Sequence, residues 1–341
     1  KGDSFRYYDT SGNIEVCNIN HQRGPQAVEF YIENLWTEAC EVETKEGKII
    51  TCQVSDHPRG KKISFVDTFE PFEKRTYTYR RIPKKQEVMN SRKCYVGSER
   101  IRDIVNDYDT VTYKLPYAFE NKWFKIAYRP GEGVLSFIDK RNGQDLMANQ
   151  EYPLFTPLYE CTSLNSHEAQ FQDTDTPPRE ERRILGRNIR GRNAKLHVGQ
   201  LDEILCLERG PVFTVLKLCF TLPGTIECAV TLKFYEEIPQ LDIRLSLGKT
   251  LSKDIESIYL PMTLQKNADS SLYLRKGDRE AFRPGMDQIP GTCMEYYASD
   301  NGIAFLSETG SILLEAKYTP LWYMGEMRHH AIKLCDGDRE N

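Results

Sequence analysis

FENKWFKIAYRPGEGVLSFIDKRNG, residues 119–143, is the stretch that decides the fold class of this chain. It contains two strand-length runs rich in aromatic and β-branched residues, 123–128 and 134–138. Gly131-Glu132-Gly133 separates the runs as a turn, and Asn142-Gly143 follows the second run. Asn-Gly is a strong hairpin signal because both residues tolerate a positive φ. The stretch therefore predicts neighbouring antiparallel strands.

Upstream, apolar and polar positions alternate with a period of two, as in half-buried strands. Strand-length runs of this kind lie at 48–54, 62–66 and 75–79. Short strands at this spacing predict a small Ig-like β-sandwich over residues 1–85. Between 86 and 116 the alternation weakens into a polar, charge-mixed stretch, which predicts a linker or short connecting strands.

Downstream, strand signals continue through most of the chain. Runs rich in β-branched and aromatic residues lie at 212–222, 226–235 and 241–247, with Pro223-Gly224 and Pro239 marking turns. No segment keeps a helical period for more than a turn or two, and no internal repeat has a fixed period. The fold class is therefore all-β: a small Ig-like β-sandwich followed by a large β-sandwich over 117–341, whose C-terminal end could be truncated.

The overall composition limits the classes of binding partner and the cellular compartment that we expect for this chain. The 46 basic and 50 acidic side chains leave a net charge of -4, which gives no long-range field for nucleic acid or acidic lipid. No stretch reaches the ~20 apolar residues of a membrane span, and the N-terminus lacks the features of a signal peptide. The 10 Cys form no Cys-x-x-Cys pair and no Asn-x-Ser/Thr sequon occurs, which favours a cytoplasmic protein with reduced thiols.

Several motifs carry a resemblance to a known family. The order of residues in 119–143 is the first, and Glu208-Arg209-Gly210-Pro211-Val212 is the second. Residues 234–242, FYEEIPQLD, and then Glu256 with Tyr259-Leu260-Pro261 follow at the expected distance. Together they resemble the large C-terminal β-domain of family 38 α-mannosidases. The chain opens at Lys1 without Met, so an internal cut or an expression scar is expected there.

The resemblance implies a non-catalytic role for this chain. Family 38 enzymes look like a catalytic α/β domain, a helical bundle and then β-domains, which include a large galactose-mutarotase-like sandwich. Their nucleophilic Asp and their zinc, held by Asp and His, belong to the N-terminal domain, which no part of this chain matches. Retaining hydrolysis needs two carboxylates ~5 Å apart, and those would lie upstream. The resemblance thus implies no catalytic residue, metal or cofactor in this chain, with zinc in the missing catalytic domain.

That resemblance also implies the partners. Carbohydrate and the missing N-terminal catalytic domain of the same protein are expected, in mannose metabolism, while an oligomer stays open. Two rival functions remain beside it. One is a free-standing carbohydrate-binding protein. The other is a mutarotase-like or polysaccharide-lyase-like enzyme, for which His167, His197 and Asp287 are the candidate acid–base residues.

The candidate substrate-binding residues are Arg283, Asp287 and Gln288, in the polar loop 279–293. Pro284-Gly285 and Pro290-Gly291 favour two type II turns, which stiffen the loop. Arginine, carboxylate and amide groups can bind sugar hydroxyls, and Phe282 or Tyr296 could stack on a sugar face. The alternative is that Arg283 and Asp287 pair with each other or with backbone carbonyls and only brace the loop.

Three further features have simpler interpretations. His329-His330 is a poor metal pair because adjacent residues of a strand point to opposite faces. Cys293 after a Gly-Thr turn is expected to be structural, since no His can be assigned to it. The basic residues between Arg179 and Lys195 are expected to form the solvated face of a hairpin, or else a groove for an anionic or phosphorylated sugar.

Overall fold

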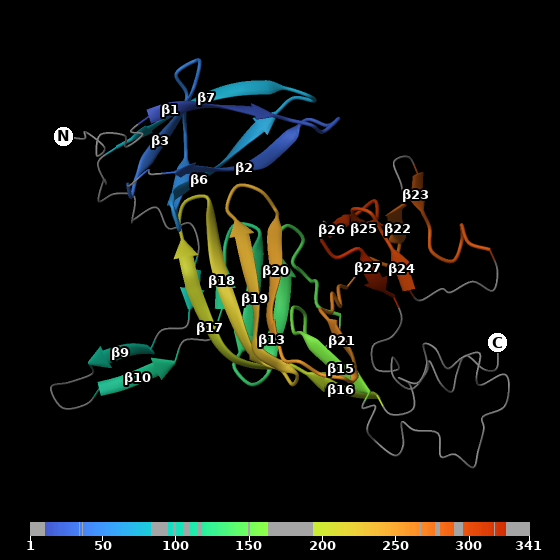
Figure 1. Cartoon of the computed structure of the whole chain (residues 1–341). Helices are drawn as coiled ribbons and strands as arrows, with labels where there is room; N and C mark the ends of the chain where they lie inside the picture. The colour runs from blue at the N-terminus through green and yellow to red at the C-terminus, as the bar shows by residue number, and fades with distance from the viewer. Residues whose placement is uncertain are drawn as a thin grey trace, which may run out of the picture. The chain divides into compact units, whose positions relative to one another are not determined.

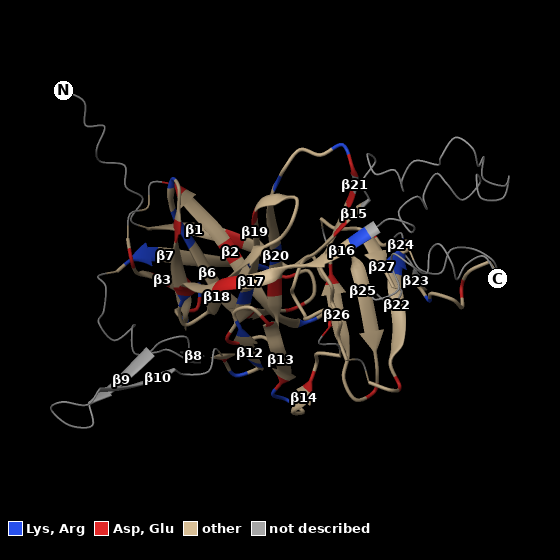
Figure 2. Ribbon diagram, turned by 90° about the horizontal axis from the view of Figure 1, so that it is seen from below, with Lys and Arg blue, Asp and Glu red and all other residues tan. Residues whose placement is uncertain are grey.

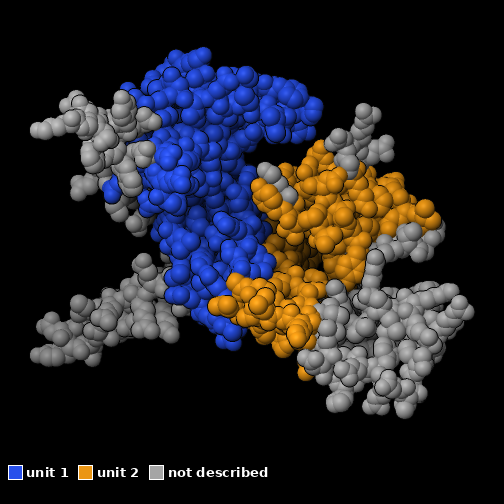
Figure 3. Space-filling view, in the orientation of Figure 1, with its two compact units in different colours: residues 1–144, 200–221, 227–247 blue, residues 145–199, 222–226, 248–341 orange. Residues whose placement is uncertain are grey.

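The structure is a computed structural model that describes residues 11–33, 35, 37–82, 95–97, 100–104, 110–114, 118–148, 151–162, 194–265, 267–276, 280–289, 296–316 and 318–324. Within these ranges the chain forms strands β1 to β27 and no helix, so the all-β prediction is confirmed. The chain divides into two compact units (Figure 3). Unit 1 comprises 1–144, 200–221 and 227–247; unit 2 comprises 145–199, 222–226 and 248–341. This division differs from the predicted domains, whose boundaries stay a prediction.

The N-terminal part of unit 1 is a small sandwich of two antiparallel sheets. One sheet has the order β1-β7-β3-β4 and the other β2-β6-β5 (Figure 1). The strands are β1 (Ser11–Cys17), β2 (Gly24–Glu33), β3 (Cys40–Thr44), β4 (Ile49–Ile50), β5 (Cys52–His57), β6 (Gly60–Phe69) and β7 (Lys74–Arg81). Val42, Ile63, Phe65 and Tyr77 are fully buried in its core.

One strand of the small sandwich differs from the prediction. A single strand is expected over 48–54, but the chain changes sheets at Thr51. β4 pairs with β3 in one sheet, whereas β5 pairs with β6 in the other. The alternation of side chains continues on both sides of this corner, so the pattern alone does not reveal it.

The remainder of unit 1 is built mainly from two larger sheets. The first has the order β14-β13-β12-β11-β8 and the second β17-β18-β19-β20, and β9 pairs with β10 as a separate ribbon. The strands are β8 (Tyr95–Gly97), β9 (Arg100–Ile104), β10 (Thr110–Lys114), β11 (Ala118–Glu120), β12 (Phe124–Arg129), β13 (Gly133–Asp139), β14 (Gln144–Asp145), β17 (Gln200–Arg209), β18 (Phe213–Thr221), β19 (Thr225–Tyr235) and β20 (Leu241–Lys249). The ring centroids of Phe119 and Phe234, one from each sheet, lie 4.3 Å apart.

Residues 119–143 form antiparallel strands, as their sequence predicts. β11 and β12 pair from Ala118 to Glu120, and β12 and β13 pair around the glycine turn. Gly131 and Gly133 have φ values of 85° and 89° there. Gly143 has a φ of 73° in the turn that follows β13, a conformation that favours glycine.

Unit 2 contains a three-stranded sheet, β16-β15-β21, a four-stranded sheet, β23-β22-β25-β26, and the ribbon β24-β27. Its strands are β15 (Leu158–Thr162), β16 (Ala194–Val198), β21 (Ile255–Tyr259), β22 (Ser271–Lys276), β23 (Glu280–Phe282), β24 (Tyr296–Ala298), β25 (Gly302–Leu306), β26 (Ile312–Glu315) and β27 (Leu321–Tyr323). Leu274, Tyr297 and Ile303 form a buried cluster that partly buried Phe282 and Trp322 extend.

Charged side chains of both signs are mixed along the strands (Figure 2). Many form cross-strand ion pairs at the surface, such as Lys74 of β7 with Glu15 of β1 at 2.9 Å and Lys217 of β18 with Glu227 of β19 at 3.3 Å. Exposed pairs of this kind contribute ~0–1 kcal/mol each, so packing is the main source of stability.

Candidate functional site

The loop with the predicted substrate-binding residues follows β23 and begins with a tight turn. Gly285 has a φ of 78°, and the Met286 amide donates to the Arg283 carbonyl at 3.1 Å. This is the geometry of a type II turn with Pro284 and Gly285 at its centre, as their sequence predicts. The second expected turn, Pro290-Gly291, lies outside the described residues.

Arg283 and Asp287 pair with each other in this loop. Asp287 Oδ1 accepts a hydrogen bond from Arg283 Nη2 at 2.9 Å, and Oδ2 accepts from the Arg283 amide at 2.9 Å and from Nε at 3.2 Å. These hydrogen bonds from Arg283 hold the pKa of Asp287 below its usual value. The bracing alternative therefore describes this geometry. The side chains of Arg283 and Asp287 remain partly exposed, at 48% and 33%. Contact of this loop with a sugar stays a prediction.

Gln288 attaches the loop to the core of unit 2. Its Oε1 accepts a hydrogen bond from the Gly285 amide at 2.8 Å and another from the hydroxyl of buried Tyr297 at 2.8 Å. A side chain held from two directions presents a fixed geometry, which lowers the entropy lost on binding a ligand.

Only one of the two aromatic candidates for sugar stacking is well exposed. Phe282 is partly buried against Tyr297, with ring centroids 6.1 Å apart, and Lys276 Nζ lies 4.4 Å from the Phe282 centroid. Tyr296 is 39% exposed and lies beside Tyr323 with centroids 4.8 Å apart. Tyr296 is therefore the better candidate for a stacking contact.

A second polar cluster in unit 2 was not predicted from the sequence. Glu256 Oε1 accepts a hydrogen bond from the Tyr159 hydroxyl at 2.5 Å and one from Lys249 Nζ at 2.7 Å. Hydrogen bonds from Lys249 and Tyr159 lower the pKa of Glu256, and burial raises the pKa of Tyr159. Glu256 is one of the family-like residues, but its partners follow from strand register, which sequence spacing does not show.

His197 lies on β16, next to the strand that carries Tyr159. It pairs with Tyr159 across β15 and β16, and the two ring centroids lie 6.1 Å apart. A histidine and a carboxylate thus share one sheet, but the carboxylate is Glu256. Asp287, the expected acid–base partner, is engaged by Arg283 instead.

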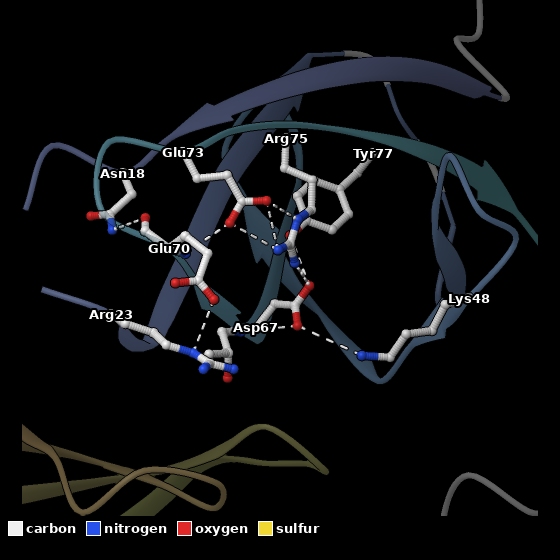
Figure 4. Close-up of polar contacts among 9 residues, drawn as sticks. Asn18, Arg23, Lys48, Asp67, Glu70, Glu73, Arg75 and Tyr77 are labelled. Atoms are coloured by element: carbon white, nitrogen blue, oxygen red, sulfur yellow. Dashed lines mark hydrogen bonds and ion pairs between the residues drawn. The ribbon is translucent and has the colours of Figure 1, made fainter.

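The small sandwich holds a denser network of charged side chains (Figure 4). Asp67 Oδ2 accepts hydrogen bonds from Arg75 Nη1 at 2.8 Å and from the Tyr77 hydroxyl at 2.9 Å, and Glu73 binds the same guanidinium with both oxygens. Burial and the hydrogen bond to Asp67 raise the pKa of Tyr77. These mutual contacts indicate a brace between β6 and β7 and not an open site.

Several predicted features lie outside the described residues. They are His167, Cys293, His329-His330 and the basic segment except Ala194 and Lys195. Where the structure describes the chain, it contains no group of three or more His, Cys, Asp or Glu placed to hold a metal ion, and its cysteines are free thiols. The described part also has no helix that is long and apolar enough to cross a membrane.

The chain was compared with family models, with curated proteins and with solved structures. Neither the scan of family models nor the search of curated proteins found a match. Among solved structures, an α-mannosidase from Enterococcus faecalis V583 is similar, with a TM-score of 0.48 and 10% sequence identity over 88% of this chain. The chain spans 37% of the length of that mannosidase. Similarity at this level establishes neither a family nor an activity for this chain.

Proposed function

We propose that this chain is the non-catalytic β-sandwich region of a glycoside hydrolase that resembles α-mannosidases. In this role its sandwiches support a sugar-binding site, and the catalytic carboxylates and zinc belong to a separate domain of the same protein. The proposal combines the family-like motifs of the sequence with the place of those motifs in the fold.

The observation that carries the proposal is the meeting of these motifs in unit 1. Asn121 Nδ2 donates to the Tyr235 carbonyl at 2.9 Å, and Trp123 Nε1 donates to the Glu236 carbonyl at 3.0 Å. The Glu236 amide in turn donates to the Val212 carbonyl at 2.9 Å. Three motifs that are distant in sequence thus form one buried junction, as expected of a shared scaffold.

The same junction includes the small sandwich. Gln53 Oε1 accepts hydrogen bonds from the Val212 and Phe213 amides at 3.1 and 3.0 Å. Gln53 Nε2 and the Ser55 hydroxyl both donate to Glu208 Oε1, at 2.6 and 2.5 Å. Buried hydrogen bonds of this kind fix orientation as well as distance. The family-like segment 208–212 therefore joins two sandwiches, which supports a scaffolding role.

The test is to assay the isolated chain and its full-length parent on an aryl α-mannoside. We expect no turnover from the chain alone, and turnover by the parent that is lost when zinc is chelated. Turnover by the isolated chain would contradict the non-catalytic role. A correctly folded parent that is inactive on α-mannosides would contradict the proposed enzyme class.

The role of the Arg283 loop is tested separately in the parent. If the loop forms part of the sugar site, Arg283→Ala is expected to raise KM about tenfold, the cost of about one lost charged hydrogen bond. The thermal midpoint should hardly change, because the ion pair with Asp287 is partly exposed. Arg129→Ala is the matched control, since it removes an exposed pair with Glu132 at 2.7 Å in unit 1. Equal KM values for the two variants would assign the loop a bracing role only.

A further inference from the structure

Two cysteines lie side by side in the core of the small sandwich. Cys40 begins β3 and is buried, while Cys52 begins β5 and is partly buried. Both pack in the same apolar cluster, which also contains Val42 and Ile50. The thiol of Cys52 donates a hydrogen bond to the Cys40 carbonyl at 3.1 Å. Each thiol therefore lies next to the residue that carries the other.

The pairing of β3 with β4 explains why the two cysteines meet. Val42 pairs with Ile50, and the same register continued by two residues places Cys40 opposite Cys52, just past the change of sheet at Thr51. Opposite residues of antiparallel strands have Cα atoms ~4.5–5.5 Å apart. A disulfide requires a Cα separation of ~4.4–6.8 Å. The backbone is therefore arranged for a bond between these two thiols without a large movement.

This arrangement gives the pair a covalent chemistry. We propose that Cys40 and Cys52 form a disulfide when the chain meets a low-molecular-weight disulfide, such as glutathione disulfide, and that this bond joins the two sheets of the small sandwich. One protein thiolate attacks the external disulfide, forms a mixed disulfide and releases one glutathione thiolate. The other protein thiolate attacks the sulfur of the first and releases the second glutathione. The two cysteines together lose two protons and two electrons, and the external disulfide is reduced to two thiols.

Burial makes this exchange slow once the sandwich has folded. Burial is the main cause that raises the pKa of Cys40 to about 11 and the pKa of Cys52 to about 12. Arg81 opposes the shift at Cys40, whereas the charges of Cys40 and Glu41 add to it at Cys52. Because only the thiolate attacks a disulfide, few folded molecules react at neutral pH. Oxidation is therefore expected mainly during folding, when solvent reaches both thiols.

The bond would restrain both the small sandwich and its neighbour in unit 1. It would connect the sheet β1-β7-β3-β4 to the sheet β2-β6-β5. Since the two cysteines are twelve residues apart, it closes a short loop and restricts mainly the unfolded chain. Cys52 also precedes Gln53, which accepts hydrogen bonds from the Val212 and Phe213 amides. Oxidation would therefore fix the start of the strand that binds segment 208–212.

The experiment is refolding of this chain in a buffer of reduced and oxidised glutathione, followed by alkylation of free thiols and peptide mapping by mass spectrometry. Trypsin cleaves after Lys45 and Lys48, so the peptides of Cys40 and Cys52 separate unless a disulfide joins them. We expect the joined peptides from most molecules, and their separation on reduction. The oxidised chain should also unfold at a thermal midpoint about 5–10 °C above that of the reduced chain.

Three variants locate the bond. Cys40→Ser and Cys52→Ser each remove one partner, and Cys206→Ser is the matched control because Cys206 is exposed on β17. Glutathione oxidation should raise the thermal midpoint of the native chain and of Cys206→Ser, but not that of Cys52→Ser. Since Cys52 is only partly buried, Cys52→Ser should fold even if Cys40→Ser does not. Peptide mapping of the native chain depends on neither variant.

Complete alkylation of Cys40 and Cys52 after oxidative refolding would overturn the inference. The same holds if the main product links either cysteine to glutathione or to a different cysteine. Joined peptides with an unchanged thermal midpoint would contradict the claim that the bond holds the two sheets together. None of these results depends on glycosidase activity, so a failure of the proposed function remains distinguishable.

Discussion

Gly302→Ala is expected to destabilise unit 2 by about 3–5 kcal/mol, combining backbone strain with overpacking. Gly302 has a φ of 136°, which L-residues with a side chain rarely adopt. A Cβ at this position would overlap the Leu314 carbonyl oxygen and would lie 2.9 Å from the carbonyl carbon. Both are backbone atoms of the paired strand β26, so they cannot rotate away. Chemical denaturation followed by tyrosine and tryptophan fluorescence measures the change.

The matched control is Gly131→Ala in the turn between β12 and β13. Gly131 also has a positive φ, of 85°, but a methyl group at this position would have no neighbouring atom within 4 Å. Alanine there should therefore lose only the conformational preference of glycine, about 1 kcal/mol. If both variants lose the same stability, the close approach of β26 to Gly302 is not the cause.

Local signals explain most of the fold that could be predicted from sequence. The two strands within 119–143 and their glycine turn follow from alternation and from turn residues that act over a few positions. The turn at Pro284-Gly285 is local in the same way, and so is the pairing of Arg283 with Asp287 four residues later.

Features that depend on register could not be predicted in this way. Thr51 marks a change of sheet, although the alternation continues on both sides of it. Tyr159 meets Glu256 because β15 pairs with β21, and a shift of one residue in that pairing would turn Glu256 to the other face. Sequence alone thus located strands and turns, whereas the side chains that meet across strands required the structure.

The second large effect is expected for Asn121→Ala, which removes three hydrogen bonds from the junction of the family-like motifs. Asn121 is 3% exposed, donates to the Tyr235 carbonyl and accepts from the Trp123 and Phe124 amides at 2.9 and 2.8 Å. Alanine would leave these buried backbone groups without the Asn121 side chain as partner. We expect a loss of about 3 kcal/mol in the free energy of unfolding, since each unsatisfied group costs about 1–3 kcal/mol.

Asn142→Ala on the exposed turn after β13 is the control for this variant. Asn142 makes two hydrogen bonds to Gln144, at 3.3 and 3.0 Å, and water can replace both. Its loss should therefore cost less than about 0.5 kcal/mol. A larger loss of stability in Asn121→Ala than in Asn142→Ala would also support the proposed scaffolding role, because a scaffold that joins distant motifs depends on the contacts between those motifs more than on its exposed turns. Equal denaturation midpoints for the two variants would show that the Asn121 junction is not what holds these sheets together.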